Sequence, residues 1–283
     1  MTIPEGIAYG LLQGITEFLP VSSSGHLALA QNFFGGNAGG DGYFTFMVFL
    51  HLGTLAAVIA AYYKDVFGIV KAFFTLSAKL FRGKLKEGLD KSEKLFLLLA
   101  AATLPLFAAT VFADKIENLI NLSRVIGGLL IINGIMLFLA DKIKRPPVSL
   151  GEEQNGKHAK PSHALIIGFF QLLGVLPGIS RSGSTITGGL AVGLDRTDAV
   201  KFSFLMSIPA IAGANILELF KIKSHPLPAG SSPAVIIGVL TAAAAGMGAI
   251  KLLQYMAKNK KLTYFSVYCI IAGAAAIIAE LFI

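Results

Sequence analysis

Charged residues are scarce in this sequence of 283 residues. Only 14% of the residues are charged whereas 54% are hydrophobic, which leaves too little charge to cover a soluble protein of this size. Apolar runs recur along the whole chain and are separated by short polar segments. This composition predicts an all-α polytopic membrane protein.

Cysteine and acidic residues are also few. Cys269 is the only cysteine, so one chain can build neither a disulfide nor a thiolate metal site. The 24 basic residues outnumber the 16 acidic ones but lie in loops between apolar runs, which indicates contact with anionic membrane lipids and no nucleic-acid partner. Residues 1–12 lack a basic segment and a small-residue cleavage site, so we expect no cleaved signal peptide. The sequence leaves a homodimer open.

The apolar segments form two halves joined by a polar linker at 142–160. Each half starts with two apolar segments that are shorter than the roughly 20 residues of a membrane span. A polar turn separates them, which predicts a re-entrant helical hairpin. In the first half, 1–141, we expect a hairpin at 7–34 and transmembrane helices at about 43–63, 95–112 and 125–140. In the second half, 161–283, we expect a hairpin at 164–194 and transmembrane helices at about 201–219, 233–255 and 262–282.

One further apolar segment, 67–81, carries Lys71 and Lys79 and predicts an interfacial amphipathic helix. The two halves repeat one another at a constant offset, at which Gln13 falls on Gln171 and residues 22–25 fall on 180–183. Each half has one hairpin and three spans, hence an odd number of crossings. We therefore predict two inverted-topology repeats whose interrupted helices meet at a binding site.

Loop charges predict how the chain is oriented. Eight basic residues lie in 64–94, five in 142–160 and three in 258–261, whereas the alternate loops together hold four. The positive-inside rule then places the basic loops in the cytoplasm and both termini outside. The two hairpins enter from opposite sides, and their turns meet near the midplane.

The second turn places Arg181 in otherwise apolar surroundings, within the sequence Pro-Gly-Ile-Ser-Arg-Ser-Gly-Ser-Thr at 177–185. Ionisable residues inside a membrane are usually functional, because burying their charge is costly. The guanidinium, the neighbouring hydroxyls and the open amides of the turn favour an anion such as phosphate. The structural alternative is a tight packing turn whose arginine pairs with a helix carboxyl end or a lipid headgroup.

The first turn supplies acid, base and hydroxyl groups. Gln13 and Glu17 lie four residues apart on one helical face. They are followed by three serines and a histidine, Ser22, Ser23, Ser24 and His26. A nucleophilic attack on phosphorus needs such groups opposite a cation, and Arg181 is the cation here. Taken singly, His26 could instead begin a helix capped by Ser24, and Glu17 could form an interfacial ion pair.

Both turns resemble those of a known family, the undecaprenyl-diphosphate phosphatases associated with bacitracin resistance. The family's first motif is Glu or Gln, three residues and Glu, which Gln13 and Glu17 match. Its second motif, Pro-Gly-x-Ser-Arg-Ser-x-x-Thr, is matched by 177–185, and the stretch 18–26 is similar as well. The resemblance implies a multi-pass protein of the bacterial cell membrane that removes the terminal phosphate from a polyprenyl diphosphate. The product would be the monophosphate carrier used in cell-wall synthesis.

The resemblance also implies help from a divalent cation, Mg²⁺ or Ca²⁺, and no organic cofactor. Gln13 stands where the family also accepts a glutamate, so Glu17 is the only acid within either motif. We therefore expect a metal ion to bridge phosphate oxygens, with Glu17 as the one acid able to contact it, rather than to occupy a protein cage.

For this reaction we expect Arg181 to bind the diphosphate and Glu17 to be the general base. His26 is a second acid–base group or a phosphorylated intermediate. Ser23 is the preferred nucleophile, with Ser22 and water left open. The expected catalytic residues are thus Glu17, Ser23, His26 and Arg181. The expected substrate-binding residues are Gln13, Ser22, Gly178, Ser180, Ser182, Gly183 and Thr185.

The alternative function is a carrier, a transporter or flippase of a phosphorylated polyprenyl lipid or anion. Inverted repeats with interrupted helices are typical of transporters, and Arg181 would then bind phosphate without hydrolysis. A carrier has no need of Glu17 and His26 beside a hydroxyl, which favours the phosphatase. A purely structural lipid-binding protein would leave both polar turns unexplained.

Overall fold

The computed structural model describes residues 1–34, 41–84, 88–112, 116, 119–150, 158–221, 227, 230–259 and 261–282. Within these ranges the chain forms helices joined by turns and irregular segments, with isolated β-bridges beside the linker. The first half forms the helices α1 (Ile3–Phe18), α2 (Ser23–Phe34), α3 (Asp41–Ala61), α4 (Tyr63–Phe81), α5 (Lys91–Thr103) and α7 (Ser123–Asp141). It also forms the 3₁₀ segments η3 (Leu104–Phe112) and η4 (Leu119–Asn121). The second half forms α8 (Pro161–Leu173), α9 (Arg181–Ala191), α10 (Arg196–Lys221), α11 (Ser232–Lys258) and α12 (Thr263–Ala279).

The helices have the length and surface of a membrane protein. Four described segments are long and apolar enough to cross a bilayer, Lys91–Ala109, Ser123–Asp141, Arg196–Ile216 and Ser232–Lys258. Large apolar side chains, among them Ile15, Ile132 and Leu240, are exposed, as expected of surfaces that face lipid. The prediction of an all-α polytopic membrane protein is confirmed.

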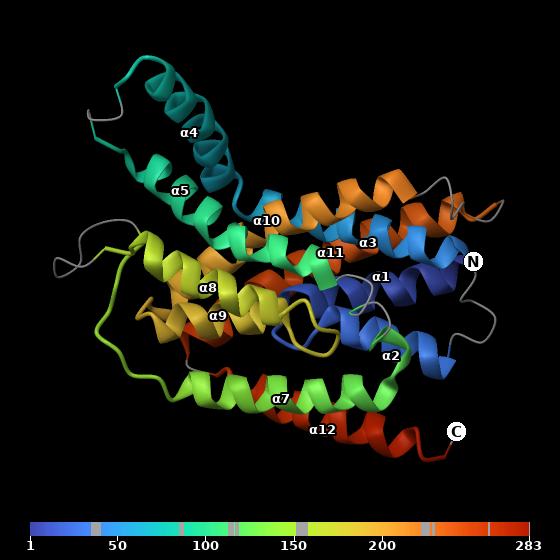
Figure 1. Ribbon diagram of the computed structural model, residues 1–283. Helices are drawn as coiled ribbons and strands as arrows, with labels where there is room; N and C mark the ends of the chain where they lie inside the picture. The colour runs from blue at the N-terminus through green and yellow to red at the C-terminus, as the bar shows by residue number, and fades with distance from the viewer. Residues whose placement is uncertain are drawn as a thin grey trace.

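α4 stands off the bundle at the upper left of Figure 1, and α5, which packs against it, leads back to the bundle beside α8. The chain bends by 92° where α3 gives way to α4, at Tyr62. The side chain of Gln254 donates to the Tyr62 hydroxyl at 2.7 Å, and Lys201 pairs with Asp65 at 2.7 Å, so α11 and α10 hold the bend. α4 contains the segment 67–81 expected at the membrane interface and begins four residues before it.

Two expected spans contain less regular α-helix than their apolar length suggests. The span expected at 95–112 is α-helical only as far as Thr103 and continues as η3, because Pro105 lacks a backbone N–H and restricts the residue before it. The last expected span, 262–282, is the 17-residue helix α12. At 1.5 Å per residue α12 is about 25 Å long. The other expected spans differ from the observed helices by a few residues at their ends.

The two hairpin pairs approach each other inside the bundle. A turn at 19–22 joins α1 to α2, and a turn at 174–180 joins α8 to α9. In Figure 1 these pairs enter from opposite ends, their turns meet near the centre, and both chain termini lie at the same end. The site described below is built where the turns meet.

The halves pack across each other rather than side by side. α1 lies along α11, α5 along α8, and α7 along α12. In the core, the ring of Phe18 from α1 packs edge-on against Phe204 of α10, with ring centroids 5.4 Å apart and both side chains fully buried. Each hairpin is thus held in place by helices from the other half.

α1 approaches α11 closely because glycines face it. Gly6, Gly10 and Gly14 recur every four residues on α1. A Cβ atom built on Gly10 would lie 2.5 Å from the backbone oxygen of Gly238. Small residues at this spacing let two helix backbones touch inside a membrane. The contact fixes the position of α1 and therefore of Glu17 at its carboxyl end.

We predict that Gly10→Ala lowers the free energy of unfolding by about 1–3 kcal/mol, the usual cost of overpacking. Gly248 of α11 provides the matched control, since a Cβ atom built there meets nothing within 4 Å. Gly248→Ala should leave stability unchanged or raise it, because alanine favours helix. Denaturant unfolding in detergent measures both variants. Equal destabilisation by the two substitutions would contradict the close-packing argument.

Candidate active site

Each hairpin turn contains a residue with an unusual backbone conformation. Ser22 in the first turn has a φ of 73°, which is rare for a residue with a side chain. Gly178 in the second has a φ of 106°, and a Cβ atom there would lie 2.6 Å from the backbone oxygen of Ile126, so only glycine fits. The Ser22 hydroxyl accepts from the backbone N–H groups of Gly25 at 3.2 Å and Gly178 at 3.1 Å. One hydroxyl therefore caps α2 and joins the two turns.

Two more side chains join the turns. The hydroxyl of Ser182, in the first turn of α9, donates to the carbonyl oxygen of Leu19 at 3.2 Å. The side-chain amide of Asn133, from α7, donates to the carbonyl oxygen of Pro20 at 2.9 Å and accepts from the backbone N–H of Ser180 at 3.1 Å. The turns are thus fixed to each other at three points, and a third helix supplies one of them.

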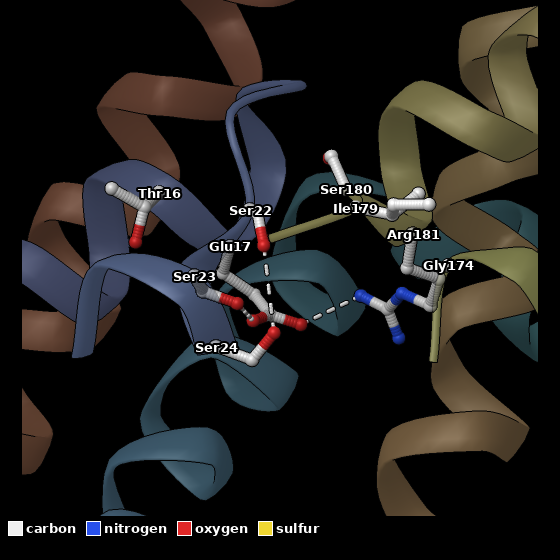
Figure 2. Close-up of a pocket in the computed structure, with 9 residues that line it drawn as sticks. All are labelled: Thr16, Glu17, Ser22, Ser23, Ser24, Gly174, Ile179, Ser180 and Arg181. Carbon is white, nitrogen blue, oxygen red and sulfur yellow. Dashed lines mark hydrogen bonds and ion pairs between the residues drawn. The ribbon is translucent and has the colours of Figure 1, made fainter. Parts of the chain in front are cut away.

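Glu17, at the carboxyl end of α1, is the centre of the site. Its Oε1 accepts from Nη2 of Arg181 at 2.6 Å, and its Oε2 accepts from the Ser23 hydroxyl at 2.6 Å and the Gln13 amide at 3.0 Å. Figure 2 shows the carboxylate between Ser23 on α2 and Arg181 on α9. The side chain of Glu17 is 5% exposed and that of Arg181 19%. Each charge therefore depends on the other to offset the cost of burial.

A small cavity lies beside this ion pair. Its lining comes from both hairpins: Thr16, Glu17, Ser22, Ser23, Ser24, Gly174, Ile179, Ser180 and Arg181 (Figure 2). The cavity measures about 40 Å³, which at 10–15 Å³ for each water is room for about three waters. A diphosphate is larger than this space beside the intact ion pair.

His51 is a residue of this site that the sequence analysis missed. It lies in the middle of α3, and its Nε2 is 3.9 Å from Oε2 of Glu17. Its Nδ1 donates to the carbonyl oxygen of Met47 at 2.7 Å, which fixes the ring with Nε2 toward the carboxylate. The signal for it in the sequence was a histidine within an otherwise apolar span.

Most of the expected substrate-binding residues lie behind the cavity lining. The Thr185 hydroxyl, for example, contacts the hydroxyl of Ser203 at 2.6 Å and donates to the backbone oxygen of Arg181 at 2.9 Å. Of that set, Ser22 and Ser180 line the cavity. The others support it from behind, namely Gln13, Gly178, Ser182, Gly183 and Thr185.

His26 lies outside the cavity lining, between the first turn and α12. Its Nδ1 donates to the carbonyl oxygen of Ser22 at 2.7 Å, so Nε2 of the neutral ring accepts from the Tyr268 hydroxyl at 2.8 Å. The two rings also stack, with centroids 5.6 Å apart. The alternative in which Ser24 caps the helix is wrong, because α2 begins at Ser23 and the oxygen that caps it belongs to Ser22.

The side chains of the site do not form a protein cage for a metal ion. Among the residues that the structure describes, no group of three or more histidine, cysteine, aspartate or glutamate side chains could hold one. Both oxygens of Glu17 already accept hydrogen bonds, from Arg181, Ser23 and Gln13. The expected contact between Glu17 and a cation stays a prediction.

Comparison with known proteins identifies the family. The family model described as "Bacitracin resistance protein BacA" matches residues 6–275. The chain belongs to the BacA family. A protein named undecaprenyl-diphosphatase from Alkaliphilus metalliredigens is 38% identical to it over 99% of this chain and 100% of the relative. One of the same name from Halothermothrix orenii is 38% identical over 98% of this chain and 98% of the relative. The one from Thermosipho africanus is 37% identical over 95% of this chain and 97% of its own length.

The match to the BacA family confirms the resemblance that the two motifs indicated. It includes both hairpins and the helices around them, because residues 6–275 extend from α1 into α12. The two turns of this BacA protein therefore belong to a fold shared along the whole chain rather than to isolated sequence similarities.

The Glu17–Arg181 pair of this BacA protein can be tested by a double-mutant cycle. Glu17→Gln should lower the free energy of unfolding by about 3 kcal/mol, because it leaves the Arg181 guanidinium buried without its counterion. The double variant Glu17→Gln/Arg181→Gln should recover most of this loss, since it buries no charge. Denaturant unfolding in detergent measures all four proteins. Strictly additive effects would mean that the two charges do not stabilise each other.

Proposed function

We propose that this protein is a phosphatase that hydrolyses undecaprenyl diphosphate to the monophosphate and inorganic phosphate. One observation carries the proposal: the hydroxyl of Ser23 donates to the carboxylate of Glu17, which also binds the guanidinium of Arg181. A nucleophile, a base and an anion-binding cation thus share one small space inside a membrane protein. The full-length relatives named undecaprenyl-diphosphatase support the same activity and substrate. The monophosphate would return to cell-wall synthesis.

Arg181 binds the diphosphate in this proposal. A guanidinium can hold two phosphate oxygens by parallel hydrogen bonds. α9 begins at Arg181, so the positive end of the helix dipole favours the same anion. Because the cavity is too small for a diphosphate beside the intact ion pair, binding replaces the carboxylate by phosphate at Arg181. Glu17 is then free to act as a base.

Ser23 is the nucleophile that the geometry favours. Its hydroxyl lies 2.6 Å from Oε2 of Glu17, within reach of a general base. Ser22 is less suited, because its oxygen accepts two backbone hydrogen bonds. In the first step the Ser23 proton moves to Glu17, the bond from Oγ to phosphorus forms, and the bond from phosphorus to the bridging oxygen breaks, which releases undecaprenyl monophosphate. Water then attacks the phosphoserine, the bond from Oγ to phosphorus breaks, and inorganic phosphate leaves while Oγ regains a proton from Glu17. Direct attack of water on the diphosphate is the alternative.

Two histidines lie near these groups and can exchange the proton. His51 faces Glu17 with its Nε2 at 3.9 Å. His26, the second acid–base group expected from the sequence, is held between the carbonyl oxygen of Ser22 and the hydroxyl of Tyr268. A divalent cation enters the proposal only through the substrate, whose phosphate oxygens are the ligands that Mg²⁺ and Ca²⁺ prefer. No step above depends on it.

The test is release of inorganic phosphate from undecaprenyl diphosphate by purified protein in detergent, at several Mg²⁺ and Ca²⁺ concentrations. Ser23→Ala should lower kcat by about a hundredfold or more, because it removes the attacking oxygen and the proton that Glu17 accepts. Ser24→Ala is the matched control: this hydroxyl lines the same cavity but lies 3.5 Å from Ser22 rather than on Glu17. It should keep kcat within about twofold.

Other outcomes of this assay would change the assignment. An unaltered rate for Ser23→Ala would transfer the attack to water or Ser22. If the unaltered protein moves the lipid across a bilayer without releasing phosphate, the carrier function replaces the phosphatase.

We also propose that both termini lie outside the cell membrane and the basic loops in the cytoplasm. The basic segment 64–94 contains the carboxyl end of α4, and the basic segment 142–160 directly follows the carboxyl end of α7. In Figure 1 both helix ends lie at the opposite end of the bundle from the termini. Basic loops are retained on the cytoplasmic side of membrane proteins, which supports this orientation.

Cysteine labelling in intact cells tests the orientation. Cys269 is the only cysteine of the sequence, so a Cys269→Ser background supplies a protein without other thiols. A single cysteine introduced by Thr2→Cys should react with a membrane-impermeant maleimide, and one introduced by Ser77→Cys should react only with a permeant reagent. The reverse labelling pattern would invert the topology.

A further inference from the structure

A polar side chain lies at the middle of the apolar helix α7. Asn133 is fully buried, with ten residues of α7 before it and eight after it in Ser123–Asp141. Burying an amide is costly unless its hydrogen bonds are made. The partners of Asn133 therefore indicate why the sequence has an asparagine here.

The amide of Asn133 connects the two hairpin turns. Its Nδ2 donates to the carbonyl oxygen of Pro20 at 2.9 Å, and its Oδ1 accepts from the backbone N–H of Ser180 at 3.1 Å. A carbonyl can only accept and a backbone N–H can only donate, so these partners fix which way the amide points. Nδ2 also lies 3.3 Å from Sγ of Cys269 on α12. All the polar atoms of the side chain have partners.

The two hydrogen-bond partners of the Asn133 amide are close in sequence to the residues proposed to react. Pro20 precedes Ser23 by three residues, and Ser180 immediately precedes Arg181. Ser180 also N-caps α9, because its hydroxyl accepts from the N–H of Gly183 at 3.1 Å. The Asn133 amide thus holds the start of the helix that carries Arg181 at a fixed distance from the turn that carries Ser23.

We propose that Asn133 is a positioning residue for the phosphatase reaction: it sets the spacing between the nucleophile of the first hairpin and the phosphate-binding arginine of the second. This inference rests on the proposed function. In-line attack depends on alignment of the attacking oxygen with phosphorus, and a misplacement of about 1 Å can cost about a hundredfold in rate. Asn133 touches neither Ser23 nor Arg181 and acts through the backbone of the two turns.

Asn215 separates positioning from ordinary core stabilisation. It is also a buried asparagine in an apolar helix, α10, but its Nδ2 donates to the carbonyl oxygen of Ile211 on the same helix, at 2.8 Å. Leucine is similar in size to asparagine, so replacing either residue by leucine removes a buried amide without a large change in side-chain size. Only the substitution at Asn133 removes one of the three links between the two turns.

The experiment compares Asn133→Leu, Asn133→Asp and Asn215→Leu in the phosphate-release assay with undecaprenyl diphosphate. Asn133→Leu should lower kcat by about a hundredfold and change KM by less than about threefold, because the arginine that binds the diphosphate remains. Asn133→Asp keeps an acceptor for the Ser180 N–H and should lie between Asn133→Leu and the unaltered protein. Asn215→Leu should keep kcat within about twofold.

Thermal unfolding and direct binding of undecaprenyl diphosphate accompany the kinetics. Asn133→Leu should bind the lipid with nearly unaltered affinity although it turns over slowly. The proposal is overturned if Asn133→Leu retains kcat, if it loses lipid binding in proportion to rate, or if Asn215→Leu slows the reaction as much. If Asn133→Leu does not fold, an unaltered kcat of Asn133→Asp overturns it. Absence of phosphate release by the unaltered protein would instead contradict the proposed function.

Discussion

The ion pair between Glu17 and Arg181 is the interaction on which the arrangement of the hairpins depends. Neither charge could be kept at this depth alone, because burial of an unpaired charge costs more than the other contacts of a short turn can offset. The two residues come from opposite halves of the chain, on α1 and α9. Their attraction therefore requires that the hairpins meet turn to turn. The same attraction holds the carboxylate and the guanidinium together beside the cavity.

The centre of the site could be predicted from the sequence because its chemistry is exceptional there. An arginine and a glutamate amid apolar residues must be paired or must line a polar site. The apolar segments of each hairpin are too short to span a bilayer, so both turns lie near the midplane. The internal repeat adds a constraint, since Ser23 and Arg181 occupy equivalent positions in the two halves. In the structure both of these residues contact one carboxylate.

The rest of the site could not be predicted, because it depends on how each helix is rotated about its axis. His51 and Asn133 lie in apolar helices, and nothing local in the sequence tells whether such a side chain faces lipid, core or cavity. The support residues of the second turn were expected at the substrate for the same reason: a short motif lists the hydroxyls without giving their directions. One helix end was misjudged where hydropathy continues but the regular α-helix does not, at Pro105.

The crossed packing of the halves has a consequence for biogenesis. α1 is the first helix to leave the ribosome, yet the helix it lies along, α11, is almost the last. α7 likewise meets its neighbour α12 only when the chain is nearly complete. A nascent or truncated chain without α11 therefore holds Glu17 on a helix that lacks its main neighbour. The first hairpin therefore reaches its final packing only when synthesis is nearly complete.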